Sequence, residues 1–354
     1  MKHIIQNFQP MAGKHSITSS IRQVLAYQGA HLSEAMLFGL ASAYHFSYFE
    51  YKSILSPFIN GRVQPRAFEE SLARHARLDI QFHKTQSNQK AWRKVKENID
   101  QDIPVVVYVD KGALTYLRMP PGQHFGGHAV VVFGYDEQEG IVFLSDRDRD
   151  GFSITVSADE IPHDFHLVPF FELEEARASR FKPLPPENAW LTIGIGESFE
   201  APRRNQIFAA IRENMYNYLN PPLAKMGLEG IHYFSKVLYS WQEWGADKLR
   251  EAALSAFTMI DQIGGTGGGI FRKLYGEFLL ESASYAAAPA LGAIGEQYLI
   301  LGEQWDEVAR LFYMLYQGEQ PMILVDIVER IKQIYKYEEG LSNQLVKVIG
   351  AVYD

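Results

Sequence analysis

The 354-residue chain contains no cysteine, which excludes a disulfide bond and a thiolate metal site. It also lacks an apolar run of the roughly 20 residues that a membrane helix needs. The longest candidate, residues 284–302, is interrupted by Pro289 and Glu296. The first residues have no uninterrupted apolar core of signal-peptide length. We therefore expect no membrane association and a cytoplasmic location.

The chain also has fewer basic residues than acidic ones. Lysine and arginine number 34 against 42 acidic residues, which gives a formal net charge of −8. A mildly acidic chain is a poor general binder of nucleic acids or anionic membranes, so no nucleic-acid partner is expected. Apolar residues make up 47% of the chain, which is ample for a buried core in two or three domains.

Helical and strand patterns alternate up to about residue 159. Apolar spacing predicts helices over residues 17–29, 33–46, 64–78 and 89–100. Runs rich in β-branched residues predict strands over residues 102–110, 126–136, 140–146 and 151–157. The short charged gaps between the later strands indicate an antiparallel meander that follows helices, so the predicted class is α+β.

A proline-rich segment, "RFKPLPPENAW" at residues 180–190, indicates a boundary, because proline removes a backbone donor and restricts the preceding residue. One strand-like stretch follows at residues 190–196, and almost all of the remaining sequence has helical spacing. The predicted domains are residues 1–180 and a mostly α-helical domain of residues 187–354.

Ser16 stands at the start of the first predicted helix. A hydroxyl is a weak nucleophile unless a base takes its proton and the oxyanion is stabilised. The free amides of a helix N-terminus could provide that stabilisation. Ser16, Thr18 and Ser19 are also the residue types that cap helices, and the local sequence on its own favours capping.

His128 begins one predicted strand, and Asp146 ends the next. A hairpin between them would bring a carboxylate beside the imidazole, where it would fix the tautomer and stabilise the imidazolium. Asp150, and to a lesser extent Asp148, fit a solvated acidic turn instead.

His124 and His128 have the spacing of a helical zinc pair. The two glycines between them argue against a helix, so no metal site is predicted.

A nucleophile on an early helix, then a histidine and an acid on successive strands, is the order found in papain-like enzymes. The motifs also resemble a known family. "GKHSITSSIRQVLAYQGAHLSEAMLFGL", "GGHAVVVFGYD" and "VFLSD" resemble the N-terminal domain of the butirosin biosynthesis protein H family. "ARASRFKPLPPENAW" and "GGTGGGIFRKLYGEFLLESA" resemble the helical domain of unknown function that often follows it.

The resemblance implies a papain-like cysteine-peptidase fold in the N-terminal domain and acyl transfer as the activity. The donor would be an acyl group on the phosphopantetheine thioester of an acyl carrier protein, and the acceptor a small amine. No separate cofactor is implied, and a homodimer is left open. In this scheme Ser16 is the nucleophile, His128 the general base and Asp146 its orienting acid. Gln9, with Gln6 as the alternative, is the oxyanion donor.

Serine occupies the position where the family typically has cysteine, next to His15. Three interpretations remain: a Ser-His-Asp acyltransferase, an inactive relative that only binds, or a chain whose cysteine has been replaced. A papain-like peptidase or amidase that uses water as the acceptor is a further alternative.

Substrate-binding candidates are His15, Arg272 and Tyr275. Arg272 and Tyr275 share a helical face with core residues, and Arg272 is the candidate contact for a carboxylate or phosphate. The preceding glycine run, residues 264–269, has no P-loop lysine; it predicts close helix approach or a lining of the acceptor pocket. A carrier protein is usually acidic, so docking would need basic residues; the alternative is a solvated linker. The candidates are Arg177, Arg180, Lys182, Arg203 and Arg204.

Overall fold

A computed structural model describes residues 1–51, 54, 56–119, 122–147, 165–196, 199–318 and 323–350. The chain forms two compact units, and each is assembled from two separate stretches. The first comprises Met1–Glu34 and Arg77–Phe199, and the second Ala35–Ala76 and Glu200–Asp354. These units differ from the predicted boundaries of 1–180 and 187–354 in two segments. Residues 35–76 belong to the second unit, and residues 187–199, which include β9, belong to the first.

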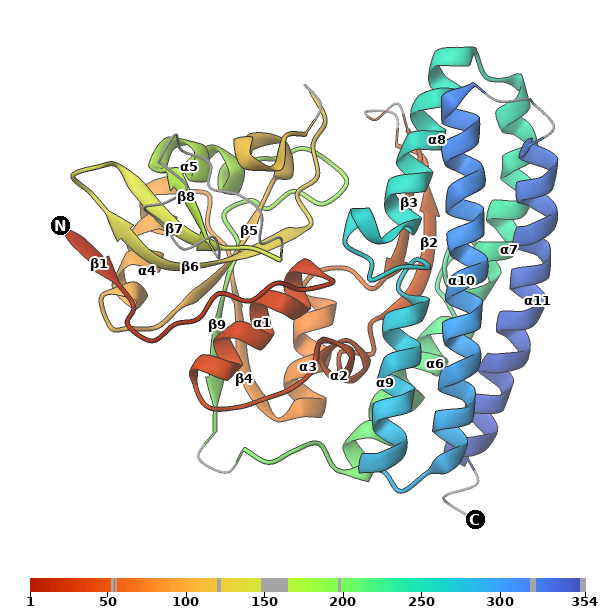
Figure 1. Cartoon of the computed structure of the whole chain (residues 1–354), viewed down its shortest axis with the longest axis horizontal. Helices are drawn as coiled ribbons and strands as arrows, with labels where there is room; N and C mark the ends of the chain where they lie inside the picture. The colour runs from red at the N-terminus through yellow and green to blue at the C-terminus, as the bar shows by residue number, and fades with distance from the viewer. Residues whose placement is uncertain are drawn as a thin grey trace. The chain divides into compact units, whose positions relative to one another are not determined.

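The first unit is built on an antiparallel sheet (Figure 1). Its described strands are β1 (Lys2–Ile4), β4 (Leu78–His83), β5 (Val105–Val109), β6 (His128–Asp136), β7 (Ile141–Ser145), β8 (His166–Pro169) and β9 (Trp190–Ile195). The spatial order is β4-β9-β5-β6-β7-β8, and β1 pairs with the end of β6. The predicted antiparallel meander is confirmed for β5, β6 and β7. The strand predicted over residues 151–157 lies outside the described residues.

Helices cover this sheet. They are α1 (Ser16–Tyr27), α4 (Asn88–Ile99) and α5 (Phe170–Ala178), with short 3-10 turns η1 (Lys111–Ala113) and η2 (Thr115–Leu117). Helix α1 packs against β5, β6 and β9 and buries the apolar face that its sequence predicted: Ile17, Ile21, Val24 and Leu25. Gly29 follows the helix with a positive φ of 86°, a conformation that glycine adopts without steric cost. The position of Ser16 thus depends on burial along the whole helix.

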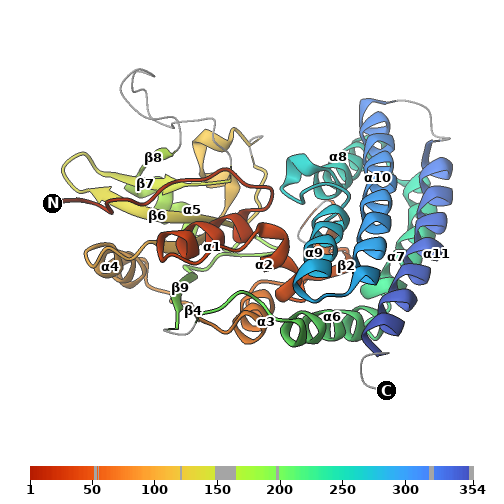
Figure 2. The same cartoon turned by 60° about the horizontal axis from the view of Figure 1, so that its bottom comes forward.

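The second unit is mostly helical. Its elements are α2 (Glu34–Leu40, whose first residue belongs to the first unit), β2 (Tyr44–Phe49), β3 (Phe58–Arg62), α3 (Ala67–Ala76), α6 (Arg204–Leu219), α7 (Gly227–Val237), η3 (Leu238–Glu243), α8 (Ala246–Ile260), η4 (Gln262–Gly264), α9 (Arg272–Tyr285), α10 (Pro289–Gln317) and α11 (Ile323–Gly350). Helices α8, α9 and α11 all pack against α10, and Figure 2 shows the long pair α10 and α11 side by side. The predicted helical C-terminal region is confirmed. No described helix is long and apolar enough to span a membrane.

The helix predicted over residues 33–46 is wrong in its second half. Helix α2 ends at Leu40, and Ser42 has a positive φ of 47°. The run that follows, "YHFSYF", is rich in aromatic residues and pairs antiparallel with β3. Tertiary pairing therefore overrides the helical spacing, because aromatic residues favour strands and nearly all residues of β2 and β3 are buried.

The glycine run allows close approach, one of the two roles predicted for it. A Cβ added to Gly269 would lie 2.4 Å from the Cα of Gly302 in α10. Gly269 also has a positive φ of 57°. Both observations require glycine at this position for steric reasons.

Candidate active site

His128 and Asp146 are in contact at one end of the sheet. His128 is the first residue of β6, and Asp146 directly follows β7, the antiparallel neighbour of β6. The imidazole Nε2 lies 2.8 Å from the carboxylate Oδ2. Their residue exposures are only 1% and 2%. The hairpin therefore holds a buried imidazole–carboxylate pair on two rigid strands.

Two further donors fix the Asp146 carboxylate. The Tyr116 hydroxyl donates to Oδ2 at 2.8 Å, and the backbone N–H of Arg147 donates to Oδ1 at 2.6 Å. Burial on its own raises the pKa of Asp146. The charge of His128 and the hydrogen bonds outweigh burial and hold that pKa well below its usual range. Asp146 is therefore an ionised acceptor at neutral pH.

Of the two imidazole nitrogens of His128, Nε2 makes the hydrogen bond to Asp146. Burial lowers the pKa of His128 below its ordinary value, and the opposing influence of Asp146 does not cancel this effect. Because the neutral ring would donate its Nε2–H to Asp146, Nδ1 would carry the lone pair. The ring makes no other hydrogen bond to a described residue. Nδ1 can therefore accept a proton, as a general base must.

Ser16 is the first residue of α1 and is 5% exposed. The amide of Ser19 donates to the His15 carbonyl at 2.9 Å, so the amides before it have no acceptor within the helix. Ser20 lies four residues further along the same helix face. Its hydroxyl donates to the carbonyl of Ala129, the neighbour of His128, at 3.2 Å. Ser16 is thus one helical turn from a contact beside His128. Within the described part of the chain no hydrogen bond joins its hydroxyl to the imidazole.

Glu34 holds the backbone that leads into α1, a role that sequence reasoning missed. Its carboxylate accepts the N–H of Lys14 at 2.9 Å and that of His15 at 3.1 Å. It also accepts the Thr18 hydroxyl at 2.8 Å. No local pattern identifies this role, because the partners lie about 20 residues earlier in the chain.

A second set of contacts ties α1 to the strand that carries Asp146. Gln23 Oε1 accepts the Ser145 hydroxyl at 2.5 Å and the N–H of Met11 at 3.1 Å. The N–H of Gly13 donates to the Arg147 carbonyl at 2.9 Å. The start of the helix and the acid strand are therefore mutually positioned. No local sequence pattern identifies Gln23 or Ser145 for this role.

Two residues near the start of the chain, predicted as an oxyanion donor and as a substrate contact, make no hydrogen bond to His128 or Asp146 in the described part of the chain. Gln9 is exposed, and its side chain makes no hydrogen bond to a described residue. The His15 ring is buried, with Nδ1 3.3 Å from the Thr18 hydroxyl. The amides at the start of α1 are therefore better placed than Gln9 as oxyanion donors.

Arg272 and Tyr275 lie in the core of the second unit. Arg272 is fully buried; its Nη2 is 2.7 Å from Glu338 Oε1, and its Nη1 donates to the His45 carbonyl at 3.0 Å. Tyr275 is also fully buried and stacks on Tyr44 with 4.6 Å between ring centroids. This placement does not support a substrate contact for either residue.

Among the predicted docking cations, all of which lie in the described part of the chain, Arg177 alone is buried and the other four are exposed. Arg177 is 3% exposed, and its burial lowers its pKa to about 10. Arg203 pairs with Glu200, and Arg204 donates to the Ala286 carbonyl at 3.0 Å. Arg180 and Lys182 are exposed. Arg177 therefore cannot belong to a docking surface.

A second histidine–aspartate pair stabilises the loop before His128. His124 Nδ1 lies 2.9 Å from Oδ2 of the fully buried Asp110. Asp110 also accepts the N–H of Phe125 at 2.9 Å and the Ser179 hydroxyl at 2.6 Å. His124 and His128 thus contact different carboxylates. Asp148 and Asp150, which the sequence assigned to a solvated acidic turn, lie outside the described residues.

Comparison with known families covers both parts of the chain. Residues 15–147 match the family model described as Butirosin biosynthesis protein H, N-terminal, a range that includes Ser16, His128 and Asp146. Residues 171–345 match the model described as Domain of unknown function (DUF4872). No curated protein matches the chain. Because the two matches follow one another in the expected order, this chain belongs to the two-domain family in which a butirosin biosynthesis protein H N-terminal domain precedes that domain of unknown function.

Proposed function

We propose that this protein is an acyltransferase of natural-product biosynthesis, with Ser16 as nucleophile. The observation that carries the proposal is the buried contact between His128 and Asp146, which leaves one imidazole nitrogen open near the start of α1. The family is named for the biosynthesis of butirosin, which supports a biosynthetic role. The donor would be an acyl group on a carrier-protein thioester, and the acceptor a small amine.

In the first step, the Ser16 oxygen attacks the thioester carbonyl while its proton moves to Nδ1 of His128. An ester bond forms, the carbon–sulfur bond breaks, and the leaving thiolate takes the proton from the imidazolium. Asp146 stabilises the transient positive charge. The unpaired amides of α1 stabilise the oxyanion.

In the second step, the amine attacks the Ser16 ester. The new carbon–nitrogen bond replaces the ester bond, and the amine proton passes through His128 back to the serine oxygen. One thioester and one amine thus become one amide and one thiol. The same arrangement with water as acceptor would give a hydrolase, so the acceptor distinguishes the transferase from a peptidase or amidase.

A papain-like fold is part of this proposal. Its support is the arrangement of a helix that begins at Ser16, an antiparallel sheet and a histidine and an acid on neighbouring strands.

Intact-protein mass spectrometry after incubation with acyl thioesters of a small thiol tests the nucleophile. We expect one acyl adduct on the wild type, its loss in Ser16→Ala and its retention in Ser240→Ala, a change at an exposed serine of the second unit. Addition of an amine should release the adduct as an amide faster than water alone does.

Three results would revise the proposal. Release only as the free acid would indicate a hydrolase. No adduct across a broad thioester panel would indicate a binding protein without catalysis. A large gain in Ser16→Cys over a weakly active wild type would indicate a site built for a thiolate, because a thiol beside a helix N-terminus ionises readily.

A further inference from the structure

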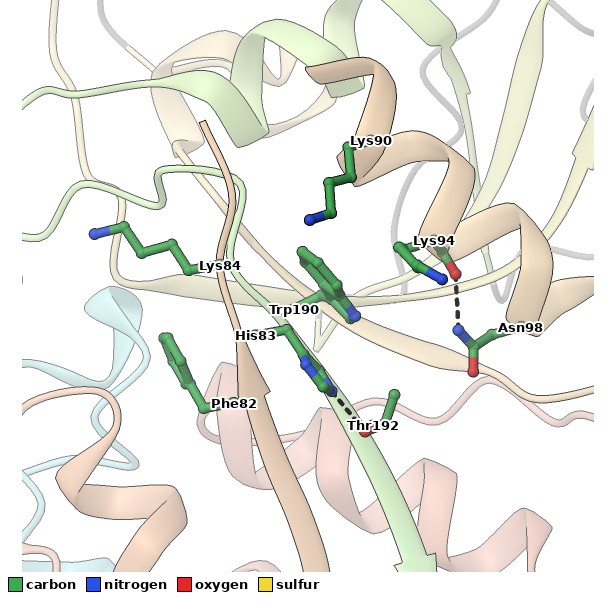
Figure 3. A pocket seen from close by; sticks show the side chains of 8 residues that line it. All are labelled: Phe82, His83, Lys84, Lys90, Lys94, Asn98, Trp190 and Thr192. Atoms are coloured by element: carbon green, nitrogen blue, oxygen red, sulfur yellow. Dashed lines mark hydrogen bonds between the residues drawn. The ribbon is translucent and has the colours of Figure 1, made fainter. Parts of the chain in front are cut away.

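A cavity of about 520 Å³ lies in the first unit, built from residues that the proposed active site does not use. Figure 3 shows its lining, which comes from the end of β4, from α4 and from β9. Cations and aromatic rings predominate among its residues: Phe82, His83, Lys84, Lys90, Lys94, Asn98, Trp190 and Thr192. Strand β5 lies between β9, which carries Trp190, and β6, which begins at His128.

The sheet side of the cavity is rigid. His83 and Trp190 are register partners on β4 and β9, and their rings stack with centroids 5.0 Å apart. The His83 Nε2 also lies 3.0 Å from the hydroxyl of Thr192. These contacts hold an aromatic surface with polar edges in a fixed orientation.

The helix side supplies the charge. Lys90, Lys94 and Asn98 are spaced four residues apart, so they share one face of α4. Ser87 caps this helix and accepts the N–H of Lys90 at 3.1 Å. In Figure 3 the side chain of Lys90 extends toward the Trp190 indole, whereas Lys84 turns away from it.

The positive charge of the cavity is only partly compensated. Lys84 pairs with Glu187, whereas Lys90 forms no ion pair with a described residue. Lys94 lies 2.7 Å from Glu97, but both side chains are nearly half exposed, and such pairs contribute little. Burial and the nearby charge of Lys94 lower the pKa of His83. The cavity is therefore a locally positive site on an acidic protein.

We propose that this cavity binds a phosphorylated organic molecule of small-metabolite size. Lys90 and Lys94 would contact the phosphate, whose charge and several acceptor oxygens suit two ammonium groups. Trp190 and His83 would contact the organic part. The volume is far larger than an inorganic phosphate ion and falls within the range of about 300–1,000 Å³ for small-molecule sites.

Titration calorimetry with three probes tests the site: adenosine 5′-phosphate, inorganic phosphate and adenosine. We expect adenosine 5′-phosphate to bind more tightly than either of the other two. Lys90→Ala combined with Lys94→Ala should weaken its binding about tenfold or more, because hydrogen bonds to charged groups are lost. Arg93→Ala removes an exposed charge from the same helix outside the cavity lining and should leave binding unchanged.

The imidazole signal of His83, followed by NMR and assigned with His83→Gln, gives a second readout. The probe should raise the pKa of His83 in the wild type and not in the double lysine variant. Lys84, Lys90, Lys94, Glu97 and Glu187 are the charged groups around this site.

Three results would each overturn the inference. The first is that neither adenosine 5′-phosphate nor inorganic phosphate binds at millimolar concentration. The others are that Arg93→Ala weakens binding as much as the double lysine variant does, or that inorganic phosphate binds as tightly as adenosine 5′-phosphate. None of these readouts requires acyl transfer, so this inference and the proposed function can fail independently.

Discussion

Each unit contains a buried acid–base pair, and the two differ in how completely they are bonded. In the first unit, His128 contacts Asp146 and keeps one ring nitrogen without a hydrogen bond to a described residue. In the second unit, Glu338 receives bonds from Arg272 and from other donors. Those other donors are Tyr44, Tyr218 and Trp305.

The difference indicates which pair can do chemistry. A saturated pair such as Arg272–Glu338 has no free proton-transfer position, and it satisfies charges that would otherwise be costly to bury. A half-used imidazole can still take and return a proton near neutral pH. We therefore expect a structural role for the pair in the second unit, whereas the pair in the first unit suits the proposed catalysis.

The largest expected effect concerns the first pair. His128→Ala should lower kcat/KM for acyl transfer by about 10²–10⁴, the usual contribution of a positioned general base. The variant should remain folded, although its urea midpoint should fall, because the buried Asp146 carboxylate loses its partner. Steady-state transfer assays and urea unfolding measure the two quantities. Normal turnover in this variant would remove His128 from the mechanism.

Disrupting the second pair should affect stability instead. Glu338→Gln leaves the Arg272 guanidinium buried without its counter-charge and should lower the free energy of unfolding by about 3–5 kcal/mol. Urea denaturation followed by circular dichroism checks this. Glu307→Gln, at an exposed pair with Arg330, is the control and should have little effect. Similar small losses in both variants would contradict the structural role.

Glu34 is a buried acid that we expect to contribute both to stability and, through the backbone before Ser16, to activity. Glu34→Gln places an amide where three donors converge and should lower the free energy of unfolding by about 1–3 kcal/mol. It should also lower kcat/KM, since the backbone before Ser16 loses its anchor. Glu97→Gln, at an exposed acid, is the control. Reduced stability with unchanged kcat/KM would limit Glu34 to a structural role.

A change of pH should affect the pairs differently and reversibly. The pKa of His128 is lowered by burial, so protonation on acidification should reduce kcat/KM only below the ordinary histidine pKa of 6.5. The free energy of unfolding should also fall as the pH is lowered, because the unfolded chain, with its ordinary histidine pKa, binds the proton before the folded chain does. Burial on its own lowers the pKa of Arg272, but the charge of Glu338 outweighs it and raises that pKa further. A pH profile of kcat/KM that keeps falling from above pH 7 would contradict this assignment.

Sequence patterns correctly predicted the helices and strands that pack against elements close to them in the sequence. The run "VVVYV" and the strand after His128 are buried on both faces, so their composition identifies them. The α1 periodicity predicted its buried face correctly. The segment 35–76 was harder, because its aromatic strand pairs with β3 and joins helices more than 150 residues away in the sequence.

The order of Ser16, His128 and Asp146, the helical C-terminal region and the family could be predicted from residue type and spacing. Which charged groups are paired and which are accessible depends on tertiary contacts. Arg272 suggested a ligand contact until Glu338, 66 residues later, proved to be its partner. Glu34, Gln23 and the lysines of α4 acquired their roles in the same way. Burial and long-range pairing decide the state of a polar group, and neither is encoded in its immediate neighbours.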